Sequence, residues 1–178
     1  MKYQNINYFL NKIDEPNATR CKNLFGDFKE RFEASPGSLR KHQAWKGGYI
    51  HHIEETMNLG LLIYTEMSAF RKLPFSFSDV VLILFLHDLE KPFRYVPTKK
   101  EFGTDIEKHD FIESLIKKYK VKLNAHHKNA LEYIHGEGDS FHRTKRIQKP
   151  LAAFVHCLDT MSARIWFDEP RKSLKNKK

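Results

Sequence analysis

The chain has 178 residues, 40% of them hydrophobic, which is the size of a single domain that can bury a core of its own. These numbers exclude a disordered chain, a collagen-like repeat and a disulfide-stapled mini-protein, and the two cysteines indicate a reducing, cytoplasmic setting. Lys and Arg outnumber Asp and Glu by 31 to 22, and the net charge of +9 favours an anionic partner such as nucleic acid. The longest hydrophobic run, Val80 to Leu86, is far too short for a membrane span, so no membrane partner is expected.

Hydrophobic residues recur at helical spacing, and Gly, Pro, Ser and Asn divide the chain into helix-length segments. The pattern predicts an all-α fold: a single compact domain of about six to eight helices over residues 1–170, followed by a basic, disordered tail at 171–178. A short segment at 5–13 and a turn or short helix at 38–44 accompany the main helices, which are expected at about 17–35, 49–70, 78–91, 104–119, 124–135 and 151–167.

Particular residues are expected to set the ends of these helices. Pro92 should end the apolar helix before it, because proline disfavours helical geometry in the preceding residue. Thr104 and Glu107 have the spacing of a capping box, and Asn124 is expected to cap the following helix. The last helix opens at Pro150 and contains Cys157, whose apolar surroundings predict a small buried thiol.

Side chains of the types that bind metals stand where core residues are expected. His52, beside His51, lies near the start of the long helix, and His87-Asp88 follows seven apolar residues. Asp159 falls on the apolar stripe of the last helix, where an ionised carboxylate needs a cation, a metal or several donors to offset its desolvation. Two imidazoles and two carboxylates spread over three helices indicate mixed His and carboxylate ligation of a divalent cation such as Zn, Mn, Fe or Co.

Each of these residues, taken alone, also has a purely structural interpretation. A single buried histidine is more often a hydrogen-bonded core residue than a ligand. A single buried aspartate more often caps a helix or pairs with an arginine, for which Arg94 and Arg164 are available. The complete set, in its order along the chain, is what favours a metal. Further imidazoles, at His126-His127 and His135, bracket one short helix.

The same residues and the sequence motifs around them resemble those of the histidine–aspartate (HD) domain metal-dependent phosphohydrolases. The segment SLRKHQAWKGGYIHHIEET is similar to the S-x-x-K-H-H-x-Y-x-G-G-L-L-E-H-T segment of the branch that includes HD-type bacterial 3′-to-5′ exoribonucleases. FLHDLEKP is similar to L-H-D-I-G-K-P, and VHCLDTMSAR is similar to H-Y-x-D-x-x-x-A-R. The three motifs occur in the family's order, and the region from the first to the last, Ser38 to Arg164, is most of the chain.

The resemblance implies an HD-type helical domain in which four residues bind one divalent cation, Mn, Co, Zn, Fe or Mg. These ligands are His52, His87, Asp88 and Asp159. Lys91 matches the family's Lys after His-Asp and is expected to neutralise a phosphate, and the expected catalytic set is Asp88, Lys91 and His135. The family's His-His-Gly motif is only partly matched here, by His135-Gly136, because Asn129 occupies the position of the upstream histidine. A second metal site would therefore have to recruit His126 or His127 with His135.

Two basic groups are the candidates for holding the substrate. Lys41, His42 and Trp45 precede the Gly-Gly turn, where the indole could stack on a base and the lysine could meet a phosphate. Arg143 lies in a basic loop after His135 and is expected to grip a phosphate or a strand. The structural alternatives are that Trp45 packs on the helix beneath it, that the loop is merely solvated, and that Lys91 is a solvated lysine at a helix C-terminus.

The resemblance implies that the chain hydrolyses a phosphoester or phosphoanhydride bond of a nucleoside or deoxynucleoside mono- or triphosphate, using a metal-activated water. The alternative is a phosphodiesterase or 3′-to-5′ exonuclease acting on short single-stranded nucleic acid, which the matched branch and the positive charge favour. A third, non-catalytic hypothesis is a metal-containing domain that binds nucleic acid or protein. HD domains are often oligomeric, so a homo-oligomer is compatible with the resemblance.

Overall fold

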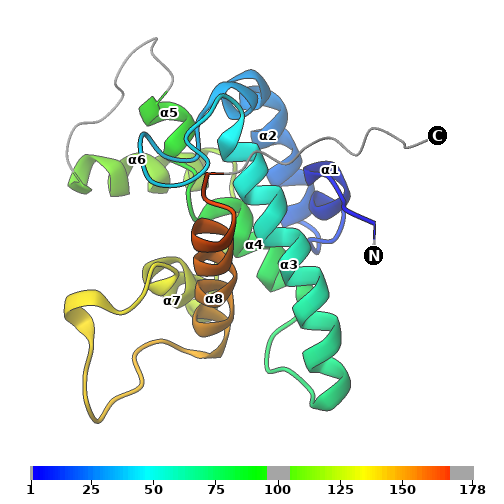
Figure 1. Ribbon diagram of the computed structural model, residues 1–178, viewed down its shortest axis with the longest axis vertical. Helices are drawn as coiled ribbons and strands as arrows, with labels where there is room; N and C mark the ends of the chain where they lie inside the picture. The colour runs from blue at the N-terminus through cyan, green and yellow to red at the C-terminus, as the bar shows by residue number, and fades with distance from the viewer. Residues whose placement is uncertain (1, 96–104, 169–178) are drawn as a thin grey trace.

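The computed structural model describes residues 2–95 and 105–168, and every regular element in these residues is helical. The all-α prediction is therefore confirmed (Figure 1). Thr104 of the expected capping box and the tail at 171–178 lie outside the described residues. In chain order the elements are α1 (Ile6–Leu10), α2 (Asn17–Ala34), α3 (Gly48–Phe70), α4 (Phe77–Leu86), α5 (Lys91–Tyr95), α6 (Asp105–Lys118), α7 (Ala125–Tyr133), a short 3-10 helix (Gly138–Ser140) and α8 (Pro150–Ile165).

Helix α4 lies at the centre of the domain. Its residues Val80 to Leu86 are each at most 2% exposed, because a helix that is apolar on all sides must be covered on all sides. Helices α1, α3, α7 and α8 pack against it, and α3 and α8 also pack against each other (Figure 1). The C-terminal end of α4 is therefore carried into the interior together with the residues that follow it. Among the described residues, no helix combines the length and apolar character that crossing a bilayer requires.

The end of α4 differs from the sequence prediction. The helix ends at Leu86, before the predicted boundary, and residues 87–90 form turns that lead directly into α5. Pro92 lies in the first turn of α5, where a missing N–H group is tolerated, so the prediction that it ends the preceding helix was wrong. This early end matters for the site, because it places His87 and Asp88 at a helix terminus rather than inside a helix.

Helix α8 begins at Pro150, as predicted, and buries one face against the core. Leu151, Val155 and Leu158 form the apolar part of that face. Cys157 is exposed, so the prediction of a buried thiol was wrong. One residue corresponds to a rotation of about 100° around a helix, and this rotation takes Cys157 away from the buried face that its neighbour Leu158 occupies.

The loop at residues 36–47 is packed tightly against the start of α3 and the end of α8. Gln43 is 1% exposed, and its backbone accepts a hydrogen bond from Gly37 N and donates one to Phe167 O. Gly47 has a φ of +81°, a left-handed conformation that suits glycine. A Cβ atom on Gly48 would stand 1.8 Å from Gln43 O, so the second glycine is required by close backbone approach. The Gly-Gly pair thus holds this loop over the N-terminal turns of α3.

Candidate metal centre

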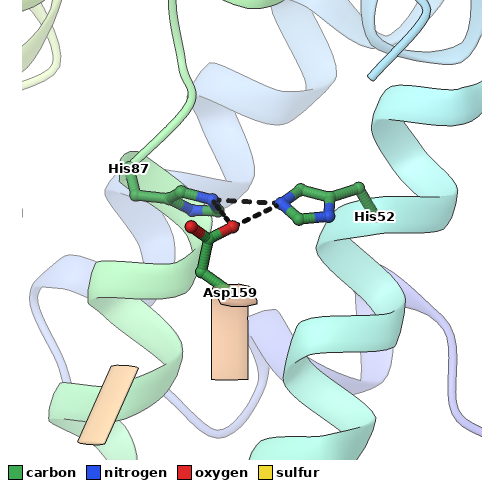
Figure 2. Close-up of side chains that lie close together, drawn as sticks. All are labelled: His52, His87 and Asp159. Carbon is green, nitrogen blue, oxygen red and sulfur yellow. Dashed lines mark hydrogen bonds and ion pairs between the residues drawn. The ribbon is translucent and has the colours of Figure 1, made fainter. Parts of the chain in front are cut away.

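Three buried side chains from three helices converge on one point. His52 comes from the first turns of α3, His87 is the residue at the C-terminal end of α4, and Asp159 comes from α8 (Figure 2). The side chains of His52 and His87 are 0% exposed and that of Asp159 is 13% exposed. Among the described residues, they form the one group of at least three His, Cys, Asp or Glu side chains that could hold a metal ion.

The spacing of the three donor atoms suits a single cation. His52 Nε2 lies 3.0 Å from Asp159 Oδ1 and 3.3 Å from His87 Nε2, and His87 Nε2 lies 3.7 Å from Asp159 Oδ1. Ligand atoms bound to one ion at about 2.1 Å stand roughly 3.0 to 3.4 Å from each other. The three atoms therefore already form a triangle of the size that a coordinated divalent cation requires.

Asp88 lies beside the two histidines of this group. Its Oδ2 lies 3.2 Å from His87 Nε2 and 3.5 Å from His52 Nε2. This oxygen is buried, forms an ion pair with Lys91, and accepts no well-directed hydrogen bond. A buried carboxylate oxygen of this kind is costly unless a cation compensates it. The chemistry of His52, His87 and Asp159 fits a divalent metal ion, and the fourth predicted ligand, Asp88, lies next to them.

Both imidazoles present the nitrogen that a metal needs. His87 Nδ1 donates to the backbone carbonyl of Leu84 at 2.8 Å, so its Nε2 is the atom that can bear the free lone pair. His52 Nδ1 lies 3.0 Å from Ser162 Oγ, which leaves its Nε2 directed at His87 and Asp159. Metal-binding histidines commonly have their second ring nitrogen held in this way, because the hydrogen bond orients the ring.

The surroundings of Asp159 and Asp88 stabilise the ionised form of both carboxylates. Burial works against charge on Asp159, but the neighbouring imidazoles of His135, His52 and His87 outweigh it and hold the pKa of Asp159 well below its usual range. Burial likewise opposes charge on Asp88, yet the charges of His87 and Lys91 hold its pKa well below the usual range. Both carboxylates are therefore ionised at neutral pH and attract a cation.

The two histidine ligands differ in their affinity for a proton. Burial lowers the pKa of His52 to about 4, and its contact with Asp159 only partly compensates. Burial also disfavours charge on His87, but the adjacent carboxylate of Asp88, helped by Asp159, raises the pKa of His87 to about 10. In the metal-free protein at neutral pH, His87 is therefore protonated on both ring nitrogens and positively charged, whereas His52 is neutral.

Lys91 and His135 complete the predicted catalytic group. Lys91 is 9% exposed and pairs with Asp88 from the first residue of α5. His135 follows α7, and its Nδ1 donates to Asp159 Oδ2 at 3.2 Å while its Nε2 lies 3.7 Å from Asp88 Oδ1. The side chain of His135 is 53% exposed, so it forms the rim between the buried centre and solvent.

The structure does not bring His127 to His135 as a second metal site. His127 Nε2 lies 2.7 Å from Asp79 Oδ1, and its Nδ1 accepts a hydrogen bond from Asn124 N in the capping box of α7. Asp79 belongs to the first turn of α4, at the opposite end of that helix from His87. Both ring nitrogens of His127 are thus engaged in joining α7 to α4.

The residues before the Gly-Gly turn are divided between the centre and the surface. The ring of His42 lies 5.0 Å from that of His52, so His42 is next to the centre. Burial lowers the pKa of His42, and the charge of Lys91 lowers it further. Trp45 donates from its indole nitrogen to His51 Nδ1 at 2.9 Å, which matches the packing alternative. Lys41 is exposed, and its backbone nitrogen is held by Ser38 Oγ.

Arg143 lies in a different part of the surface. It is exposed in the loop between the short 3-10 helix and α8. That loop is anchored near the N-terminus of α8, where Asn129 bonds the backbone of Ile147 and Lys149. The loop at residues 36–47 is instead fastened to the other end of α8. The two predicted basic groups therefore do not form one surface.

Three polar residues beside the centre, of which Gln43 and Ser162 are buried and Glu55 is half-buried, were not predicted from the sequence. Gln43, Glu55 and Ser162 form a hydrogen-bonded network that reaches His52. Glu55 follows His52 by three residues and Ser162 follows Asp159 by three, a spacing that places each on the same helical face as a ligand. This spacing was the signal that could have identified two of them.

Comparison of the chain with protein-family models, with curated proteins and with solved structures finds no match. The class of protein therefore follows from the fold and the site alone. It is an all-α protein with a buried His-His-Asp group that could hold a metal ion.

Proposed function

We propose that the protein is a metal-dependent phosphohydrolase of the HD type that acts on a nucleotide. The observation that carries the proposal is the convergence of His52, His87 and Asp159 with the carboxylate of Asp88, one side of which meets the ammonium group of Lys91. A structural metal site has no need of a buried lysine beside its ligands. A site for an anionic substrate does, because the ammonium group can neutralise phosphate charge.

The chain's own residues divide the work of hydrolysis among them. His52, His87 and Asp159, with Asp88 beside them, would hold the divalent ion. A bound cation supplies Lewis acidity, which activates water and polarises the phosphoryl group. Asp88 orients the attacking water through its carboxylate. Lys91 stabilises the charge that develops on the phosphoryl oxygens, and His135, held by Asp159 on the exposed rim, donates a proton to the leaving oxygen.

A small nucleotide suits the arrangement of basic residues. His42 lies beside the centre, and Lys41 precedes it in the same loop, within reach of a compact phosphorylated molecule. Arg143 belongs to the loop anchored at the other end of α8 and is not part of this group. We therefore favour a nucleoside or deoxynucleoside mono- or triphosphate over a long polymer.

One observation favours the second candidate, a 3′-to-5′ exonuclease or phosphodiesterase. Phe141 is 70% exposed, and the exposed Arg143, Lys145 and Arg146 follow it in the same loop. An exposed aromatic ring among basic side chains is the usual means of holding single-stranded nucleic acid, since bases stack on the ring and phosphates meet the cations. This loop would give a short strand a second point of attachment.

A metal-screened assay separates these functions. The purified protein is supplied with Mn, Co, Mg or Zn and offered nucleoside mono- and triphosphates, single-stranded RNA and single-stranded DNA in parallel. Release of phosphate or pyrophosphate from free nucleotides supports the proposal, and shortening of the strands alone supports the exonuclease. Asp88→Asn is the control, and loss of activity in it is expected. A protein that releases no product from any substrate, or an Asp88→Asn variant with full function, favours the non-catalytic hypothesis.

A further inference from the structure

Glu55 lies one helical turn after His52 on α3 and accepts hydrogen bonds from two buried groups. Ser162 Oγ donates to Glu55 Oε2 at 2.6 Å, and Gln43 Nε2 donates to the same oxygen at 3.1 Å. Gln43 is 1% exposed and Ser162 is 0% exposed. An ionised carboxylate can only accept hydrogen bonds. Glu55 therefore determines which way the Ser162 hydroxyl and the Gln43 amide point.

The first branch of this network reaches the metal centre. The hydroxyl hydrogen of Ser162 is committed to Glu55, so Ser162 Oγ is left as an acceptor for His52 Nδ1, 3.0 Å away. On the other side of the ring Asp159 Oδ1, 3.0 Å from His52 Nε2, competes for the same hydrogen until a cation takes its place. A hydrogen on Nδ1 leaves the lone pair of His52 on Nε2, the atom that faces the other ligands. His87 reaches the same tautomer through a backbone carbonyl, which no side-chain substitution removes. Of the two imidazole ligands, His52 is the one whose tautomer depends on other side chains.

The second branch reaches His42. The amide nitrogen of Gln43 faces two acceptors, Glu55 Oε2 and the Ser162 carbonyl at 3.1 Å, so its Oε1 must face the other way. His42 Nδ1 lies 2.6 Å from Gln43 Oε1. An amide oxygen only accepts, so His42 Nδ1 carries the hydrogen and its Nε2 carries the lone pair. The same carboxylate thus acts on two rings whose centres are 5.0 Å apart, on His52 through the Ser162 hydroxyl and on His42 together with the Ser162 carbonyl.

We propose that Glu55 is a positioning residue that, through Ser162 and Gln43, keeps His52 and His42 in the tautomer with a bare Nε2. For His52 this is the form that can bind a cation. For His42 it is a hydrogen-bond acceptor beside the centre, available to a hydroxyl group of a substrate or to water. The inference rests on the proposed metal centre and adds the groups that control it. Outer partners of metal-binding histidines act in this way because they fix both the ring orientation and the tautomer.

The test compares Glu55→Gln with Glu54→Gln, the same substitution at the neighbouring residue. Glu54 is 7% exposed and accepts a hydrogen bond from Ile6 N at 3.0 Å, so it faces the N-terminal helix rather than the centre. In Glu55→Gln the affinity for Co²⁺ is expected to fall about 10- to 100-fold, as is usual for the loss of an outer partner. Glu54→Gln should bind Co²⁺ as the wild type does.

Imidazole tautomers in the metal-free protein provide the second readout. Two-bond ¹H–¹⁵N correlation spectra should show hydrogen on Nδ1 of His42 in the wild type and in Glu54→Gln, and a mixture of tautomers in Glu55→Gln. For His52, where Asp159 competes for the hydrogen, the fraction with hydrogen on Nδ1 should be larger in the wild type and Glu54→Gln than in Glu55→Gln. If Glu55→Gln keeps both tautomers and its Co²⁺ affinity, the proposal is overturned. Should that variant fail to fold, Ser162→Ala removes the hydroxyl that joins Glu55 to His52 but keeps the two stronger acceptors of the Gln43 amide, Glu55 Oε2 and the carbonyl of residue 162. In Ser162→Ala the fraction of His52 with hydrogen on Nδ1 is expected to fall, while the tautomer of His42 stays as in the wild type. An unchanged His52 tautomer in this variant also overturns the proposal.

Neither readout involves a substrate, so this inference and the proposed function can fail separately. Co²⁺ binding that depends on Glu55 in a protein without nucleotide hydrolysis would support the role of Glu55 and reject the phosphohydrolase. Nucleotide hydrolysis together with unaltered Co²⁺ affinity in Glu55→Gln would reject the role of Glu55 alone.

Discussion

The Nε2 atoms of His52 and His87 lie 3.3 Å apart, within hydrogen-bonding distance, although 35 residues separate them in the chain. His87 donates from Nδ1 to the carbonyl of Leu84, and in the role inferred for Glu55 His52 donates from Nδ1 to Ser162 Oγ, 3.0 Å away. Two bare Nε2 atoms would repel at this distance, so one of them must carry a hydrogen. The raised pKa of His87, about 10, identifies it as that ring. In the metal-free protein, a proton on His87 Nε2 thus relieves the repulsion between the two Nε2 lone pairs, as a bound cation would.

Metal binding should therefore release a proton and become tighter as the pH rises. The pKa of His87 is about 10 and that of His52 about 4, so between these values only His87 has a proton to lose. Mass action then strengthens the apparent affinity about tenfold per pH unit across that range. Co²⁺ titrations at a series of pH values measure the slope, and calorimetry in buffers of different ionisation enthalpy counts the proton. An affinity that does not change with pH contradicts this assignment.

Asp79 is expected to contribute to stability without affecting the centre. Its Oδ2 accepts hydrogen bonds from Ser76 N and Ser76 Oγ in the capping box of α4, and its Oδ1 pairs with His127 of α7. Replacing it with alanine should lower the free energy of unfolding by about 1 to 2 kcal/mol, as for other lost caps. Urea denaturation measures this change, and Co²⁺ affinity should remain that of the wild type.

The same residue makes a pH prediction of definite sign. Although burial raises the pKa of Asp79, its contacts with His127 and Ser76 outweigh it and lower the pKa below the ordinary value of an aspartate. A depressed carboxyl pKa contributes stability above the unfolded pKa and loses it as the pH falls through the folded one. The difference between wild type and Asp79→Asn should therefore shrink below about pH 4. A difference that grows on acidification would falsify the assignment.

The two cysteines should differ sharply in reactivity. Cys157 is exposed, whereas Cys21 is buried, and burial raises the pKa of the Cys21 thiol to about 12. A thiolate is the reactive form, so a disulfide reagent should modify one thiol in the native protein and the second only in denaturant. Cys157→Ser should remove the fast reaction and leave the slow one. Fast labelling in Cys157→Ser would contradict the burial of Cys21.

Three of the candidate ligands stand out in the sequence because each breaks a local pattern. His87 and Asp88 interrupt an apolar run, and Asp159 interrupts an apolar stripe, so these residues stand out from their neighbours in the sequence alone. The all-α fold is also predicted by local signals, namely the helical spacing of hydrophobic residues and the Gly, Pro, Ser and Asn residues between the helices. Such signals lie within one or two helical turns, where sequence and local structure are tightly coupled.

The supporting network could not be predicted, because it depends on contacts across the chain. Gln43 is 119 residues from Ser162, and Glu55 is 107 residues from it. Gln43 has a φ of 43°, a left-handed conformation that no composition rule indicates for glutamine. The place of His127 has a local signal. Its distance of three residues from Asn124 is capping-box spacing, which is the role His127 has at the start of α7.

Gly48 provides a link between the backbone and the centre that can be tested directly. A Cβ atom there would lie 1.8 Å from Gln43 O and 3.0 Å from Gly37 N, so Gly48→Ala must push the 36–47 loop away from α3. The matched control is Gly26→Ala in α2, where a Cβ atom has no neighbour within 4 Å. Alanine favours a helix over glycine by up to about 1 kcal/mol, so this control should be stabilised.

Gly48→Ala should instead lower the free energy of unfolding by more than about 2 kcal/mol, the range of backbone clashes that cannot relax. Because the displaced loop carries Gln43, the variant should also bind Co²⁺ more weakly, whereas Gly26→Ala should bind it as the wild type does. Urea denaturation and Co²⁺ titration of both variants check the two effects. A stable Gly48→Ala with wild-type affinity would show that the loop tolerates the displacement and that the position of Gln43 does not depend on the Gly-Gly turn.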